Sequence, residues 1–265
     1  MDLKFMSFSS GSCGNCYYLE CGGQALLIDA GTSVRSLKRY MNLCGLDMDK
    51  VTGILVTHDH LDHIRNLGSF CKRLGKPVYA SEQLHEALAR HTFTGQYIGA
   101  CRRVLSAGEW NAVGNMKVRC FTVPHDATHT CGFAISAADR RFFIMTDAGR
   151  VTDEALALAR ESDVVVIESN YDVDMLMGGP YPHELKMRIC GGSGHLSNDE
   201  CAAALASFWH PGLRAVFLCH LSENNNTQEA AYAASLKALR SLNKPGHPPV
   251  FTGGSLLLKP LPREY

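Results

Sequence analysis

Short apolar runs separated by glycine-containing turns make up the first part of the chain. The runs at Leu3–Ser9, Cys16–Cys21 and 25–29 either alternate apolar and polar positions or are mostly apolar, which predicts β-strands. Gly22 and Gly23 separate the second run from the third and indicate a hairpin turn, because glycine tolerates the positive φ angles that tight hairpins need. This part of the chain is therefore expected to form a β-sheet.

Helical and strand-like patterns alternate through the rest of the chain. Leu37, Tyr40 and Met41 recur at helical spacing and predict a helix over Val34–Leu43. Further helices are expected at 64–74, at 81–90 with Ser81 as N-cap, from Thr152, at Asn198–Phe208 and at 227–241. Further strands are expected at 53–56, 77–80, 116–123, 132–136, 141–146, Val164–Glu168, Ala215–Cys219, and around Val250 and Leu256. No linker, repeat or low-complexity tract interrupts this alternation, so residues 1–265 are expected to form one layered α/β domain.

Polar residues whose side chains can take part in binding or catalysis stand directly after the predicted strands. Binding groups in open α/β sheets usually lie at strand ends, so a functional site is expected where these ends meet. The residues in these positions are Asp29, His58, His125, Asp147, Glu168 and His220.

The charge balance does not identify a partner. Lys plus Arg and Asp plus Glu both number 26, so the net charge is zero with neutral histidines. A strongly basic chain would indicate a polyanionic partner, but a local basic patch is compatible with zero net charge. Lys186 and Arg188 form only a modest basic spot in an expected surface helix. Composition therefore neither supports nor excludes a nucleic-acid partner.

The cysteines and the N-terminal sequence point to the cytoplasm. The chain has 11 cysteines, and only Cys13 and Cys16 have CxxC spacing, so no four-ligand zinc cluster is completed. Free thiols in a reducing compartment are the simpler interpretation, and a redox role for Cys13 and Cys16 stays open. No secretory signal follows Met1, and no run of about 18 apolar residues occurs, so a cytoplasmic protein without a membrane span is expected.

The strongest chemical signal is the segment Thr-His-Asp-His-Leu-Asp-His at 57–63. His58 and His60 are two residues apart after a strand that ends at Val56, so both imidazoles can face one metal ion. Asp62 and His63 begin a helix and can address a second ion. A lone HxH would be a polar turn with helix-capping aspartates, but the complete HxHxDH favours a metal site. Imidazole and carboxylate donors suit zinc, manganese or iron.

This motif, followed by strand-end His125, Asp147 and His220 in that order, resembles the metallo-β-lactamase superfamily. The resemblance implies an α/β, four-layer αββα sandwich in a single domain. It also implies two divalent metal ions (Zn²⁺ or Mn²⁺, with iron as a further option) about 3.5–4 Å apart, which activate a hydroxide that Asp62 orients. The implied ligands are His58, His60 and His125 for the first ion, Asp62, His63 and His220 for the second, and Asp147 between them. His129 ranks after His125, because it lies further from the strand end.

Longer strings narrow the resemblance to the YycJ/VicX/WalJ branch, over essentially the whole chain. These strings are SGSCGNCYY at 10–18, ESNYD at 168–172, GHLSN at 194–198 and HLSENN at 220–225. The resemblance implies a 5′→3′ exodeoxyribonuclease, with DNA favoured as the substrate and RNA still open. The chain departs from the branch at Cys13, where serine is usual, and at Tyr171, where histidine is common. Both departures leave the substrate more open than the reaction type.

A phosphodiesterase needs a group that protonates the leaving oxygen. His195 resembles the proton-donating histidine of related RNA-processing phosphodiesterases, although taken alone it would be a capping or core histidine. Glu168, at the end of a predicted strand, is a candidate to orient His195 and raise its pKa. The Gly/Ser loop at 10–15 is either a phosphate cradle or simply a tight turn.

Two other functions remain open at this point. The chain could be a (thio)ester hydrolase of the glyoxalase II type, or a non-catalytic regulatory partner of a two-component signalling system. The segment between Asp147 and Glu168 is too short for the inserted lobe of the β-CASP nucleases. The physiological metal and the oligomeric state do not follow from the sequence.

Overall fold

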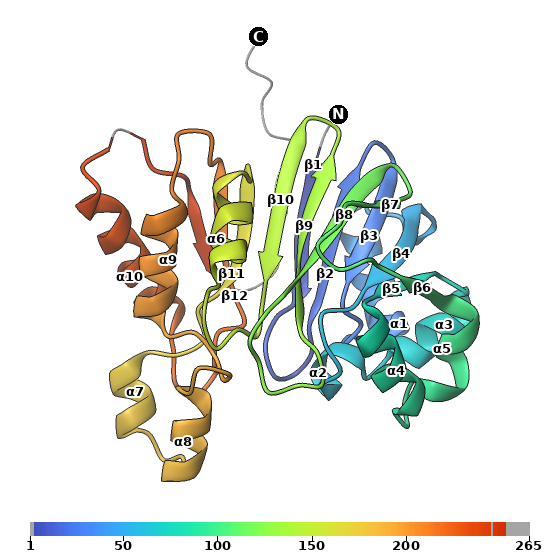
Figure 1. Ribbon diagram of the computed structural model, residues 1–265, viewed down its shortest axis with the longest axis horizontal. Coiled ribbons are helices and arrows are strands. Elements are labelled where there is room, and N and C mark those ends of the chain that lie inside the picture. Colours follow the sequence, from blue (N-terminus) through green and yellow to red (C-terminus); the bar gives the residue numbers. More distant parts are fainter. Residues whose placement is uncertain (1–2, 245, 253–265) are drawn as a thin grey trace.

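The computed structural model describes residues 3–244 and 246–252, which form two facing β-sheets (Figure 1). The first sheet has the order β1-β2-β3-β4-β5-β6. Its first three strands pair antiparallel and the rest pair parallel. The strands are β1 (Leu3–Ser9), β2 (Cys16–Cys21), β3 (Gln24–Ile28), β4 (Val51–Leu55), β5 (Val78–Ala80) and β6 (Arg102–Val104).

The second sheet has the order β13-β12-β11-β10-β9-β8-β7. Strands β10 to β13 pair parallel, and β7 to β10 pair antiparallel. The strands are β7 (Asn111–Val113), β8 (Met116–Thr122), β9 (Cys131–Ala137), β10 (Arg140–Met145), β11 (Val164–Glu168), β12 (Ala215–Cys219) and β13 (Val250–Thr252).

Apolar side chains of both sheets fill the space between them. Phe5 of β1 has its ring centroid 5.0 Å from that of Phe142 and 5.0 Å from that of Phe217, both on the second sheet. Burying such a side chain contributes about 1.5–3 kcal/mol. Successive side chains of β1 point to opposite faces of the sheet, so Leu3 and Phe5 belong to this inner core, whereas Met6 and Phe8 belong to the core on the other face.

Helices cover the outer face of each sheet, as Figure 1 shows. Each outer core combines one sheet face with the buried stripes of its helices. On the first sheet lie α1 (Val34–Leu43), α3 (Leu67–Leu74), α4 (Glu82–Arg90) and α5 (Gly95–Cys101). On the second lie α6 (Asp153–Arg160), α9 (Asn198–Phe208) and α10 (Gln228–Ser241). The predicted four-layer αββα sandwich is therefore confirmed.

Four further helical elements are short. They are η1 (Met48–Lys50), α2 (Leu61–Ile64), α7 (Val173–Gly178) and α8 (His183–Ile189). In Figure 1, α7 and α8 extend beyond the sandwich at the end where α2 also lies. None of the helices formed by the described residues has the length and apolar character that crossing a membrane requires.

The segment predicted as one helix at 64–74 is interrupted, which corrects the sequence-based expectation. Helix α2 ends at Ile64 and α3 begins at Leu67. Between them, the Asn66 backbone N–H donates to Ala30 O at 3.0 Å, and its side chain donates to Gly31 O at 2.7 Å. Asn66 is thus held by hydrogen bonds to the loop after β3. This contact is tertiary, so no local sequence pattern predicts it.

Several short elements were not predicted, namely η1, α5, β6, β7 and α7. The three residues of β6 are all exposed, and this strand is defined by its pairing with β5. Most of the other boundaries agree within one or two residues with the expected ones. The strand expected around Leu256 lies outside the described residues.

The 11 cysteines all lie among the described residues, and no disulfide bond joins any two of them. Cys13 is exposed, whereas Cys16 is buried in the core between the first sheet and its helices. A redox role for this pair stays a hypothesis.

Candidate metal centre

Three residues at strand ends share an uncommon backbone conformation. The φ angle is 63° at Asp29 and 53° at His220, directly after β3 and β12, and 51° at Asp147, two residues after the end of β10. Positive φ is rare outside glycine, although Asp and His tolerate it better than most residues, and such strain gathers at functional sites. All three side chains are buried. The sharp turns therefore bring polar groups into the interior at one end of the sandwich.

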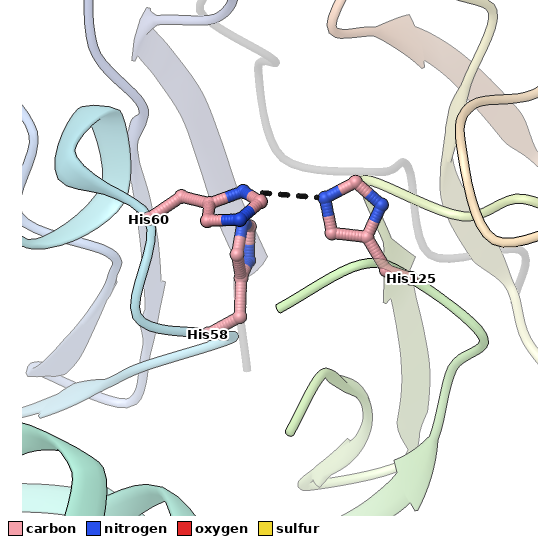
Figure 2. Close-up of side chains that lie close together, drawn as sticks. All are labelled: His58, His60 and His125. Carbon is pink, nitrogen blue, oxygen red and sulfur yellow. Dashed lines mark hydrogen bonds between the residues drawn. The ribbon is translucent and has the colours of Figure 1, made fainter. Parts of the chain in front are cut away.

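Three imidazoles form the first potential ligand group (Figure 2). His58 and His60 follow β4, and His125 follows β8. One nitrogen of each ring lies within 4.8 Å of the other two. His60 Nδ1 and His125 Nε2 face each other at 3.3 Å. Three converging imidazole nitrogens are a common ligand set of a catalytic zinc ion.

The outer nitrogens of two of these rings are held by the protein. His58 Nδ1 lies 3.0 Å from Thr57 Oγ1, and His125 Nδ1 lies 2.8 Å from Gly194 O. Gly194 must be glycine here, because a Cβ atom would lie 2.1 Å from Ile189 O. Such contacts fix the ring orientation and leave Nε2 as the inward-facing atom.

Asp62, His63 and His220 form a second group within the same distance limit. His63 Nε2 lies 3.4 Å from Asp62 Oδ2, and His220 Nε2 lies 3.7 Å from the same oxygen. The Asp147 carboxylate stands between the two groups. Its Oδ2 is 3.2 Å from His63 Nε2, and its Oδ1 is 3.4 Å from His220 Nε2 and 3.9 Å from His125 Nε2. The structure thus brings together all seven residues that the sequence named as ligands.

Buried carboxylates orient the two histidines of the second group. Asp29 Oδ2 lies 2.7 Å from His63 Nδ1, and Glu168 Oε1 lies 2.8 Å from His220 Nδ1. Carboxylate–histidine pairs of this kind are typical outer partners of metal ligands. From the sequence, Asp29 was only one of several polar residues at strand ends, and its role as an acceptor for His63 was missed. Its position after a strand was the one available signal.

The donor atoms fit a pair of divalent cations. His58 Nε2 and His220 Nε2 are buried, and neither has a hydrogen-bond partner among the described residues. Buried polar atoms are nearly always paired, so these two nitrogens indicate a missing partner at the centre of the cluster. Imidazole and carboxylate donors without thiolates suit zinc, manganese or iron.

The charges of the site also favour cations. Burial would raise the pKa of Asp147, but His220 and His63 lower it more, so it stays anionic. Burial lowers the pKa of His220, yet Asp147 and the neighbouring carboxylates raise it to about 10. In His58, burial dominates and lowers the pKa, which leaves a neutral ring with a free lone pair. The site therefore combines a carboxylate that stays anionic with the neutral His58 ring, and its negative charge, which favours a proton on His220, would equally favour a metal cation.

His195 stands beside the second group, in contact with Glu168. Its Nδ1 lies 2.8 Å from Glu168 Oε1. Burial lowers the pKa of His195, but the Glu168 carboxylate outweighs this effect, and the pKa is raised. The other carboxylate oxygen, Oε2, accepts the backbone N–H groups of Ala148 and Leu196 at 2.9 and 3.1 Å. Burial raises the pKa of Glu168, while His195 and His220 lower it to about 2.

Asn15, in the Gly/Ser loop, contacts the site through its side chain. Its Nδ2 lies 3.1 Å from Asp62 Oδ2 and 2.9 Å from His63 Nε2. The sequence had suggested a phosphate cradle built from the backbone of this loop, which stays a hypothesis. The contact of the Asn15 side chain with two of the potential ligands was not foreseen.

His129, the second choice for the strand-end histidine, is engaged elsewhere. Its Nδ1 lies 2.9 Å from Ser81 Oγ and 3.4 Å from Cys131 Sγ. It belongs to none of the potential ligand groups found among the described residues. Ser81 also caps α4, as predicted, by accepting the Leu84 backbone N–H.

An open cavity of about 290 Å³ gives access to the site. Its wall combines residues of the metal-ligand groups with residues from the α7–α8 region. It is lined by Ser12, His60, Asp62, Asp126, Asp147, Tyr181, Leu185, Arg188, Ile189, Gly194, His195 and His220.

Comparisons with known proteins agree with this geometry. The sequence profile described as the β-lactamase superfamily domain matches residues 24–220. The chain is 35% identical over 231 residues to exodeoxyribonuclease YycJ of Bacillus anthracis, which covers 87% of both chains. It is 31% identical over 237 residues to exodeoxyribonuclease WalJ of Streptococcus pneumoniae serotype 2, covering 89% of this chain and 88% of that protein.

A solved structure shares the same fold. Zn²⁺-bound PqqB from Methylobacterium extorquens superposes with a TM-score of 0.66 at 16% sequence identity. The match covers 96% of this chain and 99% of that chain. At this identity the likeness concerns the architecture alone.

Proposed function

The chain belongs to the metallo-β-lactamase superfamily, and from this premise we propose that it is a metal-dependent exodeoxyribonuclease that acts in the 5′→3′ direction. The observation that carries the proposal is the contact of His195 Nδ1 with Glu168 at 2.8 Å, beside the dinuclear ligand set. A phosphodiester leaves as an alkoxide, which a positioned acid can protonate. The relatives named exodeoxyribonuclease, at 31–35% identity, support DNA as the substrate.

The chain offers two adjacent cation sites. His58, His60 and His125 would hold one ion, Asp62, His63 and His220 would hold the other, and Asp147 would contact both. Two bound divalent ions supply Lewis acidity and lower the pKa of water at the site. Zinc and manganese are the favoured ions, with iron a further option, because imidazole and carboxylate donors suit all three.

The position of His195 suits a general acid, and the neighbouring Glu168 favours its protonated form. Because Nδ1 faces the Glu168 carboxylate, the proton available for transfer is carried by Nε2. The side chain is 22% exposed and lines the cavity, so substrate can reach it. By raising the pKa of His195, Glu168 favours the protonated ring, which would give this proton to the leaving oxygen.

Asp62 orients the attacking water. Its Oδ2 already accepts a hydrogen bond from Asn15 Nδ2 at 3.1 Å, which fixes the plane of the carboxylate. Asp62 also lines the cavity, so its second oxygen can accept a proton or a hydrogen bond from water. Burial raises its pKa, but His220 and His63 lower it more, so Asp62 stays an acceptor at neutral pH.

A nuclease assay with a matched variant tests this function. The purified protein is incubated with 5′-labelled and 3′-labelled DNA of one sequence, the corresponding RNA, and Mn²⁺ or Zn²⁺. We expect stepwise release of nucleotides from the 5′ end of DNA by the native protein and none by the Asp147→Ala variant. Elemental analysis of both proteins shows whether the loss of activity is accompanied by a loss of bound metal ions.

Three outcomes would contradict the proposal in whole or in part. Absence of DNA cleavage with every divalent metal tried would remove the nuclease assignment. Faster turnover of S-lactoylglutathione than of bis-p-nitrophenyl phosphate would instead support the (thio)ester hydrolase alternative. Preferred cleavage of RNA would keep the reaction and change the substrate.

A further inference from the structure

Arg188 is the one arginine or lysine among the described residues that line the site cavity. It lies in α8, and its side chain is 64% exposed. The same wall carries the carboxylates of Asp62, Asp126 and Asp147. A nucleic-acid end brings several negative charges into this cavity, and carboxylates alone would repel them. Arg188 is therefore the residue there that can offset the charge of a phosphate lying away from the metal ligands.

Asp126 holds the Arg188 side chain in place. Arg188 Nε donates to Asp126 Oδ2 at 2.5 Å. An arginine carries five N–H donors, and no hydrogen bond from Arg188 Nη1 or Nη2 to another described residue is formed. The Nη edge of a guanidinium matches two oxygens of a phosphate. The anchor thus fixes the plane of the group and leaves its best phosphate-binding edge free.

Lys186, two residues earlier in the same helix, does not compete for this role. Its Nζ donates to the carbonyl groups of Met177 and Gly179 at 2.8 and 2.7 Å. This lysine therefore closes the turn between α7 and α8. Of the two basic residues noted in the sequence, Lys186 therefore has a structural role, and Arg188 is available to bind a ligand.

The position of Asp126 separates Arg188 from the metal ligands by one carboxylate group. Asp126 Oδ1 lies 3.4 Å from His125 Nε2 and 3.7 Å from His60 Nε2, while Oδ2 contacts Arg188. The phosphate that is cleaved must lie against the metal ligands. The guanidinium, one carboxylate further out, is placed for a neighbouring phosphate of the same strand.

Resting on the nuclease function proposed above, we infer that Arg188 binds the terminal 5′-phosphate of the substrate, one nucleotide from the bond that is cut. Arg188 is thus a specificity-determining residue that recognises phosphorylated ends. It touches the substrate away from the reacting atoms, so its loss changes the choice of end more than the chemical step.

The test compares two versions of one oligonucleotide, with a 5′-phosphate and with a 5′-hydroxyl group. Their kcat/KM values are measured for the native protein, for Arg188→Gln and for Arg188→Lys, each loaded with the same metal. Arg39→Gln serves as the control, because Arg39 is an exposed arginine of α1 outside the residues that line the cavity.

We expect the native protein to prefer the 5′-phosphate, and Arg188→Gln to reduce this preference by about 10- to 100-fold, mainly through KM. Arg188→Lys should restore part of it, because a lysine keeps the charge but lacks the planar pair of donors. Arg39→Gln should behave as the native protein does.

Other outcomes would overturn the inference. If the native protein cuts DNA but does not distinguish the two ends, or if Arg188→Gln slows both substrates equally, Arg188 does not read the terminal phosphate, and the nuclease function stands. If the native protein cuts no DNA at all, the nuclease function fails and this inference fails with it.

Discussion

His195 Nδ1 lies 2.8 Å from Glu168 Oε1, and this contact links the proposed acid to the metal ligands. The same oxygen lies 2.8 Å from Nδ1 of His220. One buried carboxylate therefore orients both the group that donates a proton and a group that would hold a metal ion. Substitutions at Glu168 should disturb two functions together.

We predict that Glu168→Gln lowers kcat by about 100-fold or more and weakens binding of one metal ion by about 10- to 100-fold. Ala148 and Leu196 donate backbone N–H groups to Oε2, so they should keep the amide oxygen of the glutamine. Its NH₂ group would then face His195 and His220 and could not accept from them. Steady-state kinetics and metal titration measure the two effects. Reduced kcat with native metal affinity would show that His220 does not depend on Glu168.

His195→Ala should keep both metal ions yet lose about 10²–10⁴-fold in kcat on DNA, the usual scale for a general acid. The loss should be much smaller on bis-p-nitrophenyl phosphate, because p-nitrophenolate leaves readily without a proton. Elemental analysis and kinetics on both substrates test this expectation. His195 also belongs to a potential ligand group with Asp147, Glu168 and His220. A variant that loses metal would make His195 a ligand instead.

Asp29→Asn should weaken metal binding by about 10- to 100-fold, because the amide cannot serve every donor that the carboxylate serves. Asp29 accepts the backbone N–H of Thr57 at Oδ1 and contacts Thr57 Oγ1 and His63 Nδ1 at Oδ2. Asparagine tolerates the positive φ of this position, whereas alanine adds about 1–2 kcal/mol of backbone strain. Metal titration and urea unfolding of Asp29→Asn and Asp29→Ala separate the two contributions. If the two variants are equally stable, alanine adds no backbone strain at position 29.

Glu20→Gln should lower the free energy of unfolding by about 1 kcal/mol at pH 7. Glu20 accepts hydrogen bonds from Lys50 Nζ at 2.8 Å and Tyr18 Oη at 2.7 Å. Burial raises the pKa of Glu20, but Lys50 and Tyr18 lower it more, so its folded pKa lies below the ordinary value. Its contribution is therefore present above the unfolded pKa and is lost as the pH falls through the folded pKa.

Urea unfolding of Glu20→Gln at pH 7 and at decreasing pH checks the direction. The difference from the native protein should shrink in acid, because the native carboxyl also becomes neutral there. Glu86→Gln, a change at an exposed position of α4, serves as the control and should show no such trend. A difference that grows in acid would show that the charge of Glu20 does not stabilise the fold.

The order and type of most strands and helices could be predicted from the sequence, because alternation and helical spacing are local properties. The seven residues named as metal ligands could be found for the same reason, since HxHxDH is one short string and the others directly follow apolar strands. The capping serine of α4 was predictable too, because a cap acts within one turn.

What only the tertiary structure decided involves pairs of residues far apart in the chain. The sequence ranks His125 before His129, but only the packing shows that His129 contacts Ser81 instead of the site. The sequence also could not predict that Glu168 contacts His220, that Asp29 accepts from His63, or that Arg188 lines the cavity. A side chain's partners depend on how distant segments are brought together by burial of the three cores, and no local spacing records that arrangement.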